Sequence, residues 1–236
     1  MAASFTGVGV GPGDPELVTV GALRVLREVD RVFGPTLAAG DEGRAESIIR
    51  AAAPDVEVER LVFAISGGPD VQAAAHRAAV ERILAHLDGG ERLAFITLGD
   101  PNVYSTFHHL ACLVTAARPD VPIATVPGIM AFQDLAARTG TVVADGSQRL
   151  VVLSAVEGPE VVDAALADPA AAIVIYKGGR HLPGIADRLA AAGRLDGAVF
   201  GELLGLEGQR VGPLAELAGA PAAYLASVIV PPAAQR

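Results

Sequence analysis

A short loop rich in glycine and proline follows an apolar strand three times in this chain, and this repetition restricts the possible folds most. The first loop, GVGVGPGDPE, occupies residues 7–16 behind the N-terminal residues. The second, GDPNVYSTF, occupies residues 99–107 behind the apolar run LAFI. The third, VPGI, occupies residues 126–129 behind IAT. A helical pattern follows each loop, so we predict α/β sheets with ligand-binding loops at the carboxyl ends of their strands.

The first half of the chain alternates strand and helix patterns, which is typical of a largely parallel sheet. Strands are predicted at residues 5–10, from 30, at 56–62 and at 93–97, and helices at 16–29, 45–53, 71–87 and 104–117.

Residues 118–122, where two prolines flank a turn pair, form the best linker candidate. Longer apolar strands follow at 150–153, 171–176, 197–203 and 224–230, with alanine-rich helices between them. One such helix is predicted at 182–192, with Gly193 as its C-terminal stop. The sequence therefore predicts two α/β domains, residues 1–120 and residues 121–236.

Composition predicts a cytoplasmic protein with no membrane segment and no metal site. Hydrophobic residues make up 51% of the chain, which suffices for a substantial core. No apolar stretch approaches the roughly 18–20 residues of a spanning helix, and the N-terminus lacks the pattern of a secretory signal. Cys112 is the single cysteine, which excludes an internal disulfide and a multi-cysteine metal site. We expect Cys112 to be a buried apolar residue on a helix.

The charge balance argues against a nucleic-acid-binding protein. The chain carries 27 acidic and 18 basic residues, a formal net charge of −9, and no run rich in lysine or arginine. Neutralising phosphates requires a basic surface, although a local patch can oppose the net charge.

The first loop does not match a dinucleotide-binding fingerprint. Counted from Gly7 or from Gly9, the third fingerprint glycine falls on Pro12 or on Asp14. Proline removes an N–H that a phosphate would need, and the aspartate adds negative charge. Asp30 precedes its strand, which disfavours a ribose-binding role. The loop suits a neutral or cationic ligand, or it is a tight turn in which Asp14 caps the next helix.

The second and third loops have the same design. Gly99 allows a ligand to approach the backbone closely. Asp100 either accepts hydrogen bonds from an amino or ribose group of a ligand or caps the helix. Val103 and Tyr104 are expected in the first helical turn, facing the ligand. One loop from each half of the chain predicts a cleft between two domains.

The order of these motifs resembles the tetrapyrrole (corrin/porphyrin) methylase family over essentially the whole chain. The motifs are GVGVGPGDPELVTV, TLGDPNVYSTF, TVPGIMAFQ, IVIYKGGR and a closing apolar strand. The resemblance implies two α/β domains with S-adenosylmethionine in the cleft between them, S-adenosylhomocysteine as its product, and a homodimer. GDPNVYSTF together with YKGGRHLP and AYLASVIV is most similar to members that methylate precorrin-2 at C20, giving precorrin-3A in cobalamin biosynthesis.

The resemblance also implies the site residues. The cofactor contacts carried over by motif are Pro12, Leu98, Gly99, Asp100, Val103, Met130, Ala131, Tyr176, Lys177, Leu204 and Gly205. The implied substrate contacts are Tyr104, Ser105, Arg180 and His181. At Leu204 and Gly205 the segment ELLGLEGQ departs from the family's more common glycine–threonine turn.

Several activities remain open. Family members that act on uroporphyrinogen carry Tyr-Asp-Arg-Leu where this chain has VFGP at residues 32–35, which favours a later precorrin step. The alternatives are a cobalt-factor II methylase, a sister precorrin methylase, a diphthine-type protein methylase and a ribosomal RNA methylase. A non-enzymatic nucleotide-binding module is a further alternative, which the spacing of the first loop disfavours.

Methyl transfer from a sulfonium is an in-line displacement, so it needs aligned reactants and no covalent nucleophile. His108 and His109 follow the second loop and could accept a proton, but paired histidines on a helix are more often structural, and no catalytic base is assigned. Precorrin-2 carries eight carboxylates, so local cations must line the site of this acidic chain. The candidates are Arg138, Arg149, Lys177, Arg180 and His181, with Arg180 and His181 first.

Overall fold

The computed structural model describes residues 2–38, 40–63 and 68–233. The chain divides into two compact units, Met1–Met130 and Ala131–Arg236. The division lies later than the predicted boundary near residue 120. The reason is that β5 (Ile123–Val126), which follows the expected linker, pairs with β1 (Ser4–Gly9) in the first sheet.

The first unit has a five-stranded parallel sheet in the order β3-β2-β4-β1-β5. Its strands are β1, β2 (Arg31–Thr36), β3 (Val58–Val62), β4 (Arg92–Thr97) and β5. Its helices are the 3₁₀ turn η1 (Pro15–Leu17), α1 (Val20–Glu28), α2 (Arg44–Ala52), α3 (Gly68–Asp88) and α4 (Thr106–Ala117).

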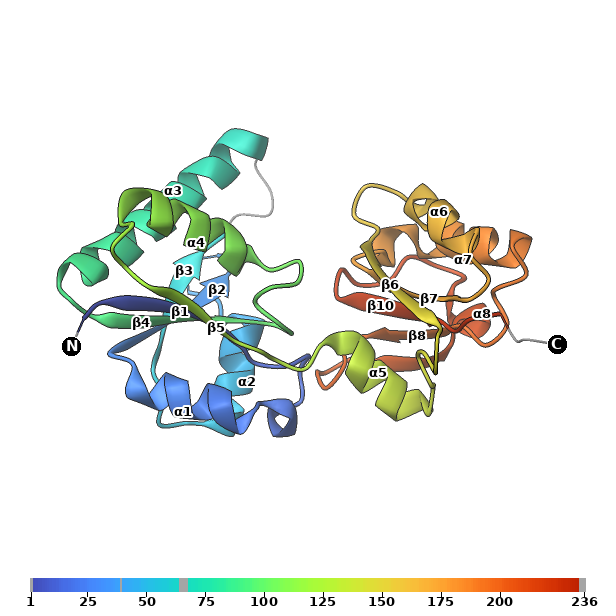
Figure 1. Ribbon diagram of the computed structural model, residues 1–236, viewed down its shortest axis with the longest axis horizontal. Helices are drawn as coiled ribbons and strands as arrows, with labels where there is room; N and C mark the ends of the chain where they lie inside the picture. Colours follow the sequence, from blue (N-terminus) through green and yellow to red (C-terminus); the bar gives the residue numbers. More distant parts are fainter. Residues whose placement is uncertain (1, 39, 64–67, 234–236) are drawn as a thin grey trace. The chain divides into compact units, whose positions relative to one another are not determined.

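Strand alternation distributes the buried side chains of the first unit over two cores. Leu93 and Phe95 of β4 pack with residues of α3 and α4, whereas Ala94 and Ile96 pack with residues of α1 and α2. The helices accordingly cover opposite faces of the sheet (Figure 1). Both faces are buried, as a parallel sheet requires.

The second unit has a mixed five-stranded sheet in the order β6-β7-β10-β8-β9. Its strands are β6 (Arg149–Ser154), β7 (Ala171–Tyr176), β8 (Val199–Glu202), β9 (Arg210–Pro213) and β10 (Ala226–Val230). Its helices are α5 (Ala131–Thr139), η2 (Pro159–Val162), α6 (Asp163–Leu166), η3 (Gly179–His181), α7 (Leu182–Ala191) and α8 (Leu214–Leu217).

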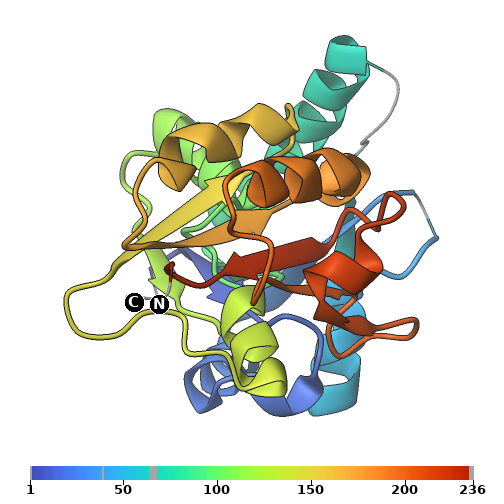
Figure 2. The ribbon, with the colours of Figure 1, turned by 90° about the vertical axis from the view of Figure 1, so that its right-hand side faces the viewer.

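Two apolar clusters hold the second sheet between helices. Ile185 and Leu189 of α7 pack against one face, and Leu135 of α5 packs against the other. Figure 2 shows α6 and α7 on the side of this sheet opposite α5. Helix α7 ends before Gly193, whose φ of +64° matches the predicted glycine stop. The prediction of two α/β units is confirmed.

Local differences from the predicted elements have local causes. The expected helix over 16–29 is interrupted, since the side chain of Thr19 accepts from Ala22 N (3.1 Å) and caps α1. The short strand β9 was not predicted. The prediction that Cys112 is buried was wrong: it is exposed. The buried face of α4 is formed by residues such as Leu110 and Val114, and Cys112 lies between them on another face.

Within the described ranges, no helix combines the length and the apolar character that crossing a bilayer requires.

Candidate functional site

The carboxyl ends of β4, β1 and β5 bring the three glycine- and proline-rich loops together. These strands are neighbours in the first sheet, although the first and second loops are far apart in sequence. The chain leaves β1 for α1 on one face and leaves β4 for α4 on the other (Figure 1). Open α/β sheets bind ligands at the carboxyl edge where the direction of the connections reverses in this way.

The three loops contact one another directly. Gly99 N donates to Gly11 O (2.8 Å) and Gly128 N donates to Asp100 Oδ2 (3.1 Å). A Cβ added at Gly9 would lie 2.4 Å from Gly99 O, and one added at Gly128 would lie 2.1 Å from the same oxygen. Gly9 and Gly128 are therefore required by backbone packing, a role that the sequence reasoning did not assign to them.

Gly99 is required for a different reason. Its φ is +63°, a conformation that favours glycine, whereas a Cβ there would meet only Met130 Cα, at 4.0 Å. The backbone of Gly99 is therefore approachable beside Met130, as a ligand-contacting glycine must be.

The two aspartates of these loops organise backbone. Asp14 Oδ1 accepts from Glu16 N (2.9 Å), which confirms the helix-capping interpretation, with Pro15 in the first turn of η1. Asp100 Oδ1 accepts from Asn102 N (2.8 Å), while its other oxygen holds Gly128. Asp100 is thus a cross-loop acceptor, neither a simple cap nor a free carboxylate.

Val103, Tyr104 and Ser105 of the second loop precede α4, so Val103 and Tyr104 are not in its first turn as expected. Ser105 is the N-cap of α4: its hydroxyl accepts from Phe107 N (3.1 Å) and donates to Thr97 Oγ1 (3.0 Å). Tyr104 has a φ of 51° and is 47% exposed, so it lies outside the helical turn in which it was expected. The left-handed backbone at Tyr104 and the cap at Ser105 together delay the start of α4 to Thr106.

The second unit also gathers its predicted residues at one edge of its sheet. Ser154 at the end of β6 is in register with Tyr176 at the end of β7, which is in register with Ser227. Glu202 at the end of β8 is in register with Ala226 at the start of β10. The turns after β6, β7 and β8 and the segment before β10 therefore share one edge.

The predicted cofactor residues of this edge differ in how they are held. The hydroxyl of Tyr176 accepts from Phe132 N (3.1 Å) in the first turn of α5. Lys177 Nζ lies 5.8 Å from the centroid of the Tyr224 ring. Leu204 is buried and belongs to the cluster of Leu135. Its side chain therefore serves the core, and a ligand contact would have to use its backbone.

Backbone strain is concentrated on the same loops. Among the described residues, three that are not glycine have a positive φ: Tyr104 (51°), Lys177 (58°) and Leu203 (52°). Lys177 directly follows β7 and Leu203 directly follows β8, whereas Tyr104 lies in the second loop, behind β4. Such conformations cost roughly 1–3 kcal/mol and are found preferentially at functional sites. Leu203 was not predicted as a site residue, although it precedes Leu204.

The basic candidates lie at different edges. Arg180 is exposed in η3, directly after β7, and no ion pair joins it to another described residue. His181 Nε2 is buried without a hydrogen-bond partner among the described residues. Arg149 begins β6 at the opposite edge and pairs with Asp168, so the proposal that it lies near this site was wrong. Arg138 pairs with Asp134 at 2.8 Å.

The remaining titratable candidates lie apart from the loops. His108 and His109 are exposed on α4. The ring of His109 lies 4.9 Å from that of His76. The pKa of His76 is lowered, mainly by burial and to a smaller extent by the charge of His109. Asp30 lies at the amino edge of its sheet, where hydrogen bonds from Arg92 hold its pKa well below the usual value. It is therefore unavailable as a ribose ligand at the carboxyl edge.

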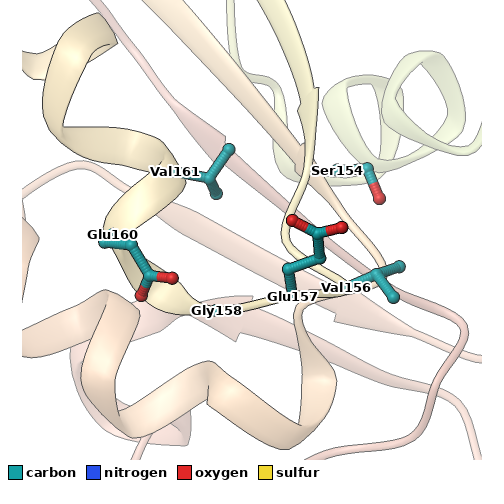
Figure 3. Close-up of a pocket in the computed structure, with 6 residues that line it drawn as sticks. All are labelled: Ser154, Val156, Glu157, Gly158, Glu160 and Val161. Atoms are coloured by element: carbon teal, nitrogen blue, oxygen red, sulfur yellow. The ribbon is translucent and has the colours of Figure 1, made fainter.

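A pocket of about 440 Å³ lies after β6 and contains none of the predicted site residues. It is lined by Ser154, Val156, Glu157, Gly158, Glu160 and Val161 (Figure 3). Its charged residues are acidic, which disfavours a polycarboxylate ligand there. The glycine–proline pair after a predicted strand was the available sequence signal for this loop.

Comparison with known proteins agrees with the motif order. Residues 4–218 match the family Tetrapyrrole (Corrin/Porphyrin) Methylases. The chain belongs to this family. It is 34% identical over 234 residues to the Precorrin-2 C(20)-methyltransferase of Sinorhizobium sp, covering 95% of this chain and 94% of that protein.

One further relative and one solved structure are also similar to this tetrapyrrole methylase. The Cobalt-precorrin-2 C(20)-methyltransferase of Salmonella typhimurium is 30% identical over 201 residues, covering 85% of this chain and 83% of that protein. The structure of a cobalamin synthesis related protein, CobF, from Corynebacterium diphtheriae superposes with a TM-score of 0.72 at 15% identity. It covers 99% of this chain and 100% of the other. At that identity the second likeness supports the fold alone.

The loop chemistry of this family member suits a neutral or cationic ligand better than a phosphate. The amides of Gly99, Asn102 and Gly128 already donate within the loops, so they are not available to an anion. The loops contain two aspartates and no lysine or arginine over residues 7–16, 99–107 and 126–129. Anion-binding loops have the opposite composition, with free N–H groups and no nearby carboxylate.

Proposed function

We propose that this chain is an S-adenosylmethionine-dependent C-methyltransferase that methylates precorrin-2 at C20 and yields precorrin-3A in cobalamin biosynthesis. The observation that carries the substrate assignment is the likeness to the Sinorhizobium enzyme, which extends over 95% of this chain and 94% of that protein. The loops of the first unit support the cofactor, because they leave Gly99 approachable and already engage the amides of Gly99, Asn102 and Gly128, which a phosphate would need free.

S-adenosylmethionine would supply a methyl group carried on a positively charged sulfur. The proposed contacts are Pro12, Leu98, Gly99, Asp100, Val103, Met130, Ala131, Tyr176, Lys177, Leu204 and Gly205. Gly99 would contribute its bare backbone. Asp100 would act mainly by holding the second loop against the third, since both of its oxygens already accept backbone N–H groups. Leu204 would contribute backbone, because its side chain is 4% exposed.

The proposed substrate contacts are Tyr104, Ser105, Arg180 and His181. Tyr104 and Arg180 are exposed and can meet a large ligand directly. The Ser105 hydroxyl is engaged in the cap of α4, so Ser105 would act by fixing Tyr104 in its left-handed conformation. Arg180 supplies the positive charge that a substrate with eight carboxylates requires.

Alignment is the main contribution that this chain can make to methyl transfer. Holding two reactants in line lowers the barrier by several kcal/mol, and by about 7–11 kcal/mol in ideal cases. The strained turns at Tyr104, Lys177 and Leu203 suit this role, because a rigid turn positions a ligand more exactly than a relaxed one. No residue is proposed as a catalytic base.

A cobalt-loaded form of the tetrapyrrole, cobalt-factor II or cobalt-precorrin-2, is the second candidate substrate. The observation that favours a cobalt-loaded substrate is the likeness to the Salmonella enzyme, which is named for cobalt-precorrin-2. Incubating the protein with each substrate and the methyl donor, followed by mass and NMR analysis, distinguishes the two. Conversion of metal-free precorrin-2 to a C20-methylated product is expected. Turnover of the cobalt form alone would replace the proposal with the second candidate.

The methyl-donor assignment has its own test. Calorimetric titration with S-adenosylhomocysteine is expected to show saturable binding. An absence of binding would refute every hypothesis in which this chain is a methylase and would favour the non-enzymatic nucleotide-binding module.

We also propose a homodimer in the cytoplasm, as the family resemblance implies. Light scattering at micromolar concentration is expected to give twice the mass of one chain, and a monomer mass would refute the dimer.

A further inference from the structure

Glu202 is a buried carboxylate at the end of β8 that the sequence reasoning did not single out. Its side chain is 7% exposed. Oε1 accepts from Arg210 Nε on the neighbouring strand β9, and Oε2 accepts from Ala223 N at 2.6 Å. Both oxygens are therefore used, and one of them binds the segment that precedes β10.

The segment Ala222–Tyr224 is held from a second side by the turn after β7. Ala222 N donates to Gly179 O at 2.8 Å. A Cβ added at Gly179 would lie 2.1 Å from Ala223 O, so the glycine and this segment are in close backbone contact. The ring of Tyr224 meets Lys177 Nζ at 5.8 Å. The segment thus links Glu202 to the turn that carries Tyr176 and Lys177.

Glu202 also precedes the strained turn that carries Leu204 and Gly205. Leu203 has a φ of 52°, and its N–H donates to Leu225 O at 3.2 Å. Gly205 N donates to the Gln209 side chain at 2.7 Å. A non-glycine residue persists in this conformation only when its surroundings hold it there. The contacts of Glu202 with Arg210 and Ala223 provide such a restraint on the residue immediately before the strain.

We propose that Glu202 is a positioning residue for the cofactor-binding turns of the second unit. Through Ala223 and Arg210 it fixes the turn of Lys177 and the turn of Leu204 in one arrangement, without touching the ligand. This inference rests on the proposed binding of S-adenosylmethionine by these turns. It predicts that the reach of the side chain to Ala223 N matters more than its charge.

The test compares three substitutions at Glu202 by calorimetric titration with S-adenosylhomocysteine, well below the melting temperature of each variant. Glu202→Gln keeps one oxygen within reach of Ala223 N but turns its amide NH2 group toward Arg210, so it gives up one of the two contacts. Because the contact with Ala223 is the one that reaches the turn of Lys177, this variant should still bind within about threefold of the unmodified protein. Glu202→Ala removes the acceptor, and Glu202→Asp is one methylene shorter. Both should weaken binding about tenfold or more, which corresponds to about 1.4 kcal/mol.

Arg194 provides the control for a merely structural effect. It is 5% exposed and donates to Ala171 O (2.8 Å) and Pro231 O (2.7 Å), at the opposite edge of the same sheet. Arg194→Met should lower the melting temperature while leaving affinity for S-adenosylhomocysteine within about twofold. Comparing it with Glu202→Ala separates loss of stability from loss of positioning.

Each result either supports the role of Glu202 or overturns it. Weak binding in the Asp variant with near-normal binding in the Gln variant supports the role of Glu202. Normal binding in the Asp variant overturns it, even when Glu202→Ala fails to fold. The proposal is also overturned if Arg194→Met loses as much affinity for S-adenosylhomocysteine as Glu202→Asp does. If the unmodified protein does not bind S-adenosylhomocysteine, the proposed function fails as well, a result distinct from normal binding by all variants.

Discussion

Replacing Gly99 with alanine should weaken cofactor binding while costing the protein only a small part of its stability. The left-handed backbone at φ +63° costs an alanine about 1–2 kcal/mol, partly offset by about 0.4–1 kcal/mol from the stiffer unfolded chain. The nearest atom to the new methyl group would be Met130 Cα at 4.0 Å, so no clash within the protein adds to this. A net loss of about 1 kcal/mol lowers the melting temperature by about 2–4 °C.

The new methyl group would instead occupy the space that the cofactor is proposed to fill. Affinity for S-adenosylhomocysteine, measured by calorimetry, should fall about tenfold or more in Gly99→Ala and be lost in Gly99→Leu. Gly90 provides the matched control: it lies before β4 at the other edge, has a φ of +82°, and its added Cβ would meet nothing within 4 Å. Gly90→Ala should show a similar melting shift with unchanged affinity. Equal affinities in the two alanine variants would refute the placement of the cofactor beside Gly99.

Three other substitutions test different parts of the reasoning. Arg180→Glu should raise the substrate KM about tenfold or more without changing the Kd for S-adenosylhomocysteine, and the rise in KM should be smaller at high salt. Arg149→Glu, at the opposite edge of the sheet, is the control. An equal rise in KM in both variants would show that the substrate does not bind beside Arg180. Gly128→Ala should lower the free energy of unfolding, measured by denaturant titration, by about 1–3 kcal/mol or more, because its Cβ would lie 2.1 Å from Gly99 O. An unchanged free energy of unfolding would show that the second and third loops are not in close backbone contact. Because the pKa of His76 is lowered in the folded state, the unfolded chain takes up the proton first as pH falls, so stability should decline below about pH 6.5. Urea unfolding should show a smaller loss of stability between pH 7 and pH 5 in His76→Asn than in the unmodified protein. An equal loss in the two proteins would exclude His76 as the cause.

The sequence predicted most helices and strands because their signals are local. The helix at 182–192 and its glycine stop follow from side-chain periodicity and from the backbone freedom of one residue, and the structure has α7 there. The capping role of Asp14 follows equally from residues within one turn. Errors such as the buried Cys112 arose where a residue type was used without knowing which face of its helix packs on the sheet.

The site required information that local patterns do not contain. The loops themselves, and therefore Gly99 and Asp100 as candidates, could be recognised from glycine and proline spacing. That Gly9 and Gly128 meet the same carbonyl of Gly99 depends on β1 lying between β4 and β5. Glu202 is an isolated acid at a strand end in the sequence, and its partners Arg210 and Ala223 come from other segments.

The sequence by itself thus determined the elements, the two-unit α/β architecture and the family, because periodicity, turn chemistry and motif order are written along the chain. The tertiary structure alone decided which loops touch, which glycines are sterically required, and that Arg180 and Arg149 lie at opposite edges of one sheet. These features depend on strand order and direction. Strand order and direction arise from pairing and packing between residues distant in sequence, for which no local pattern is specific.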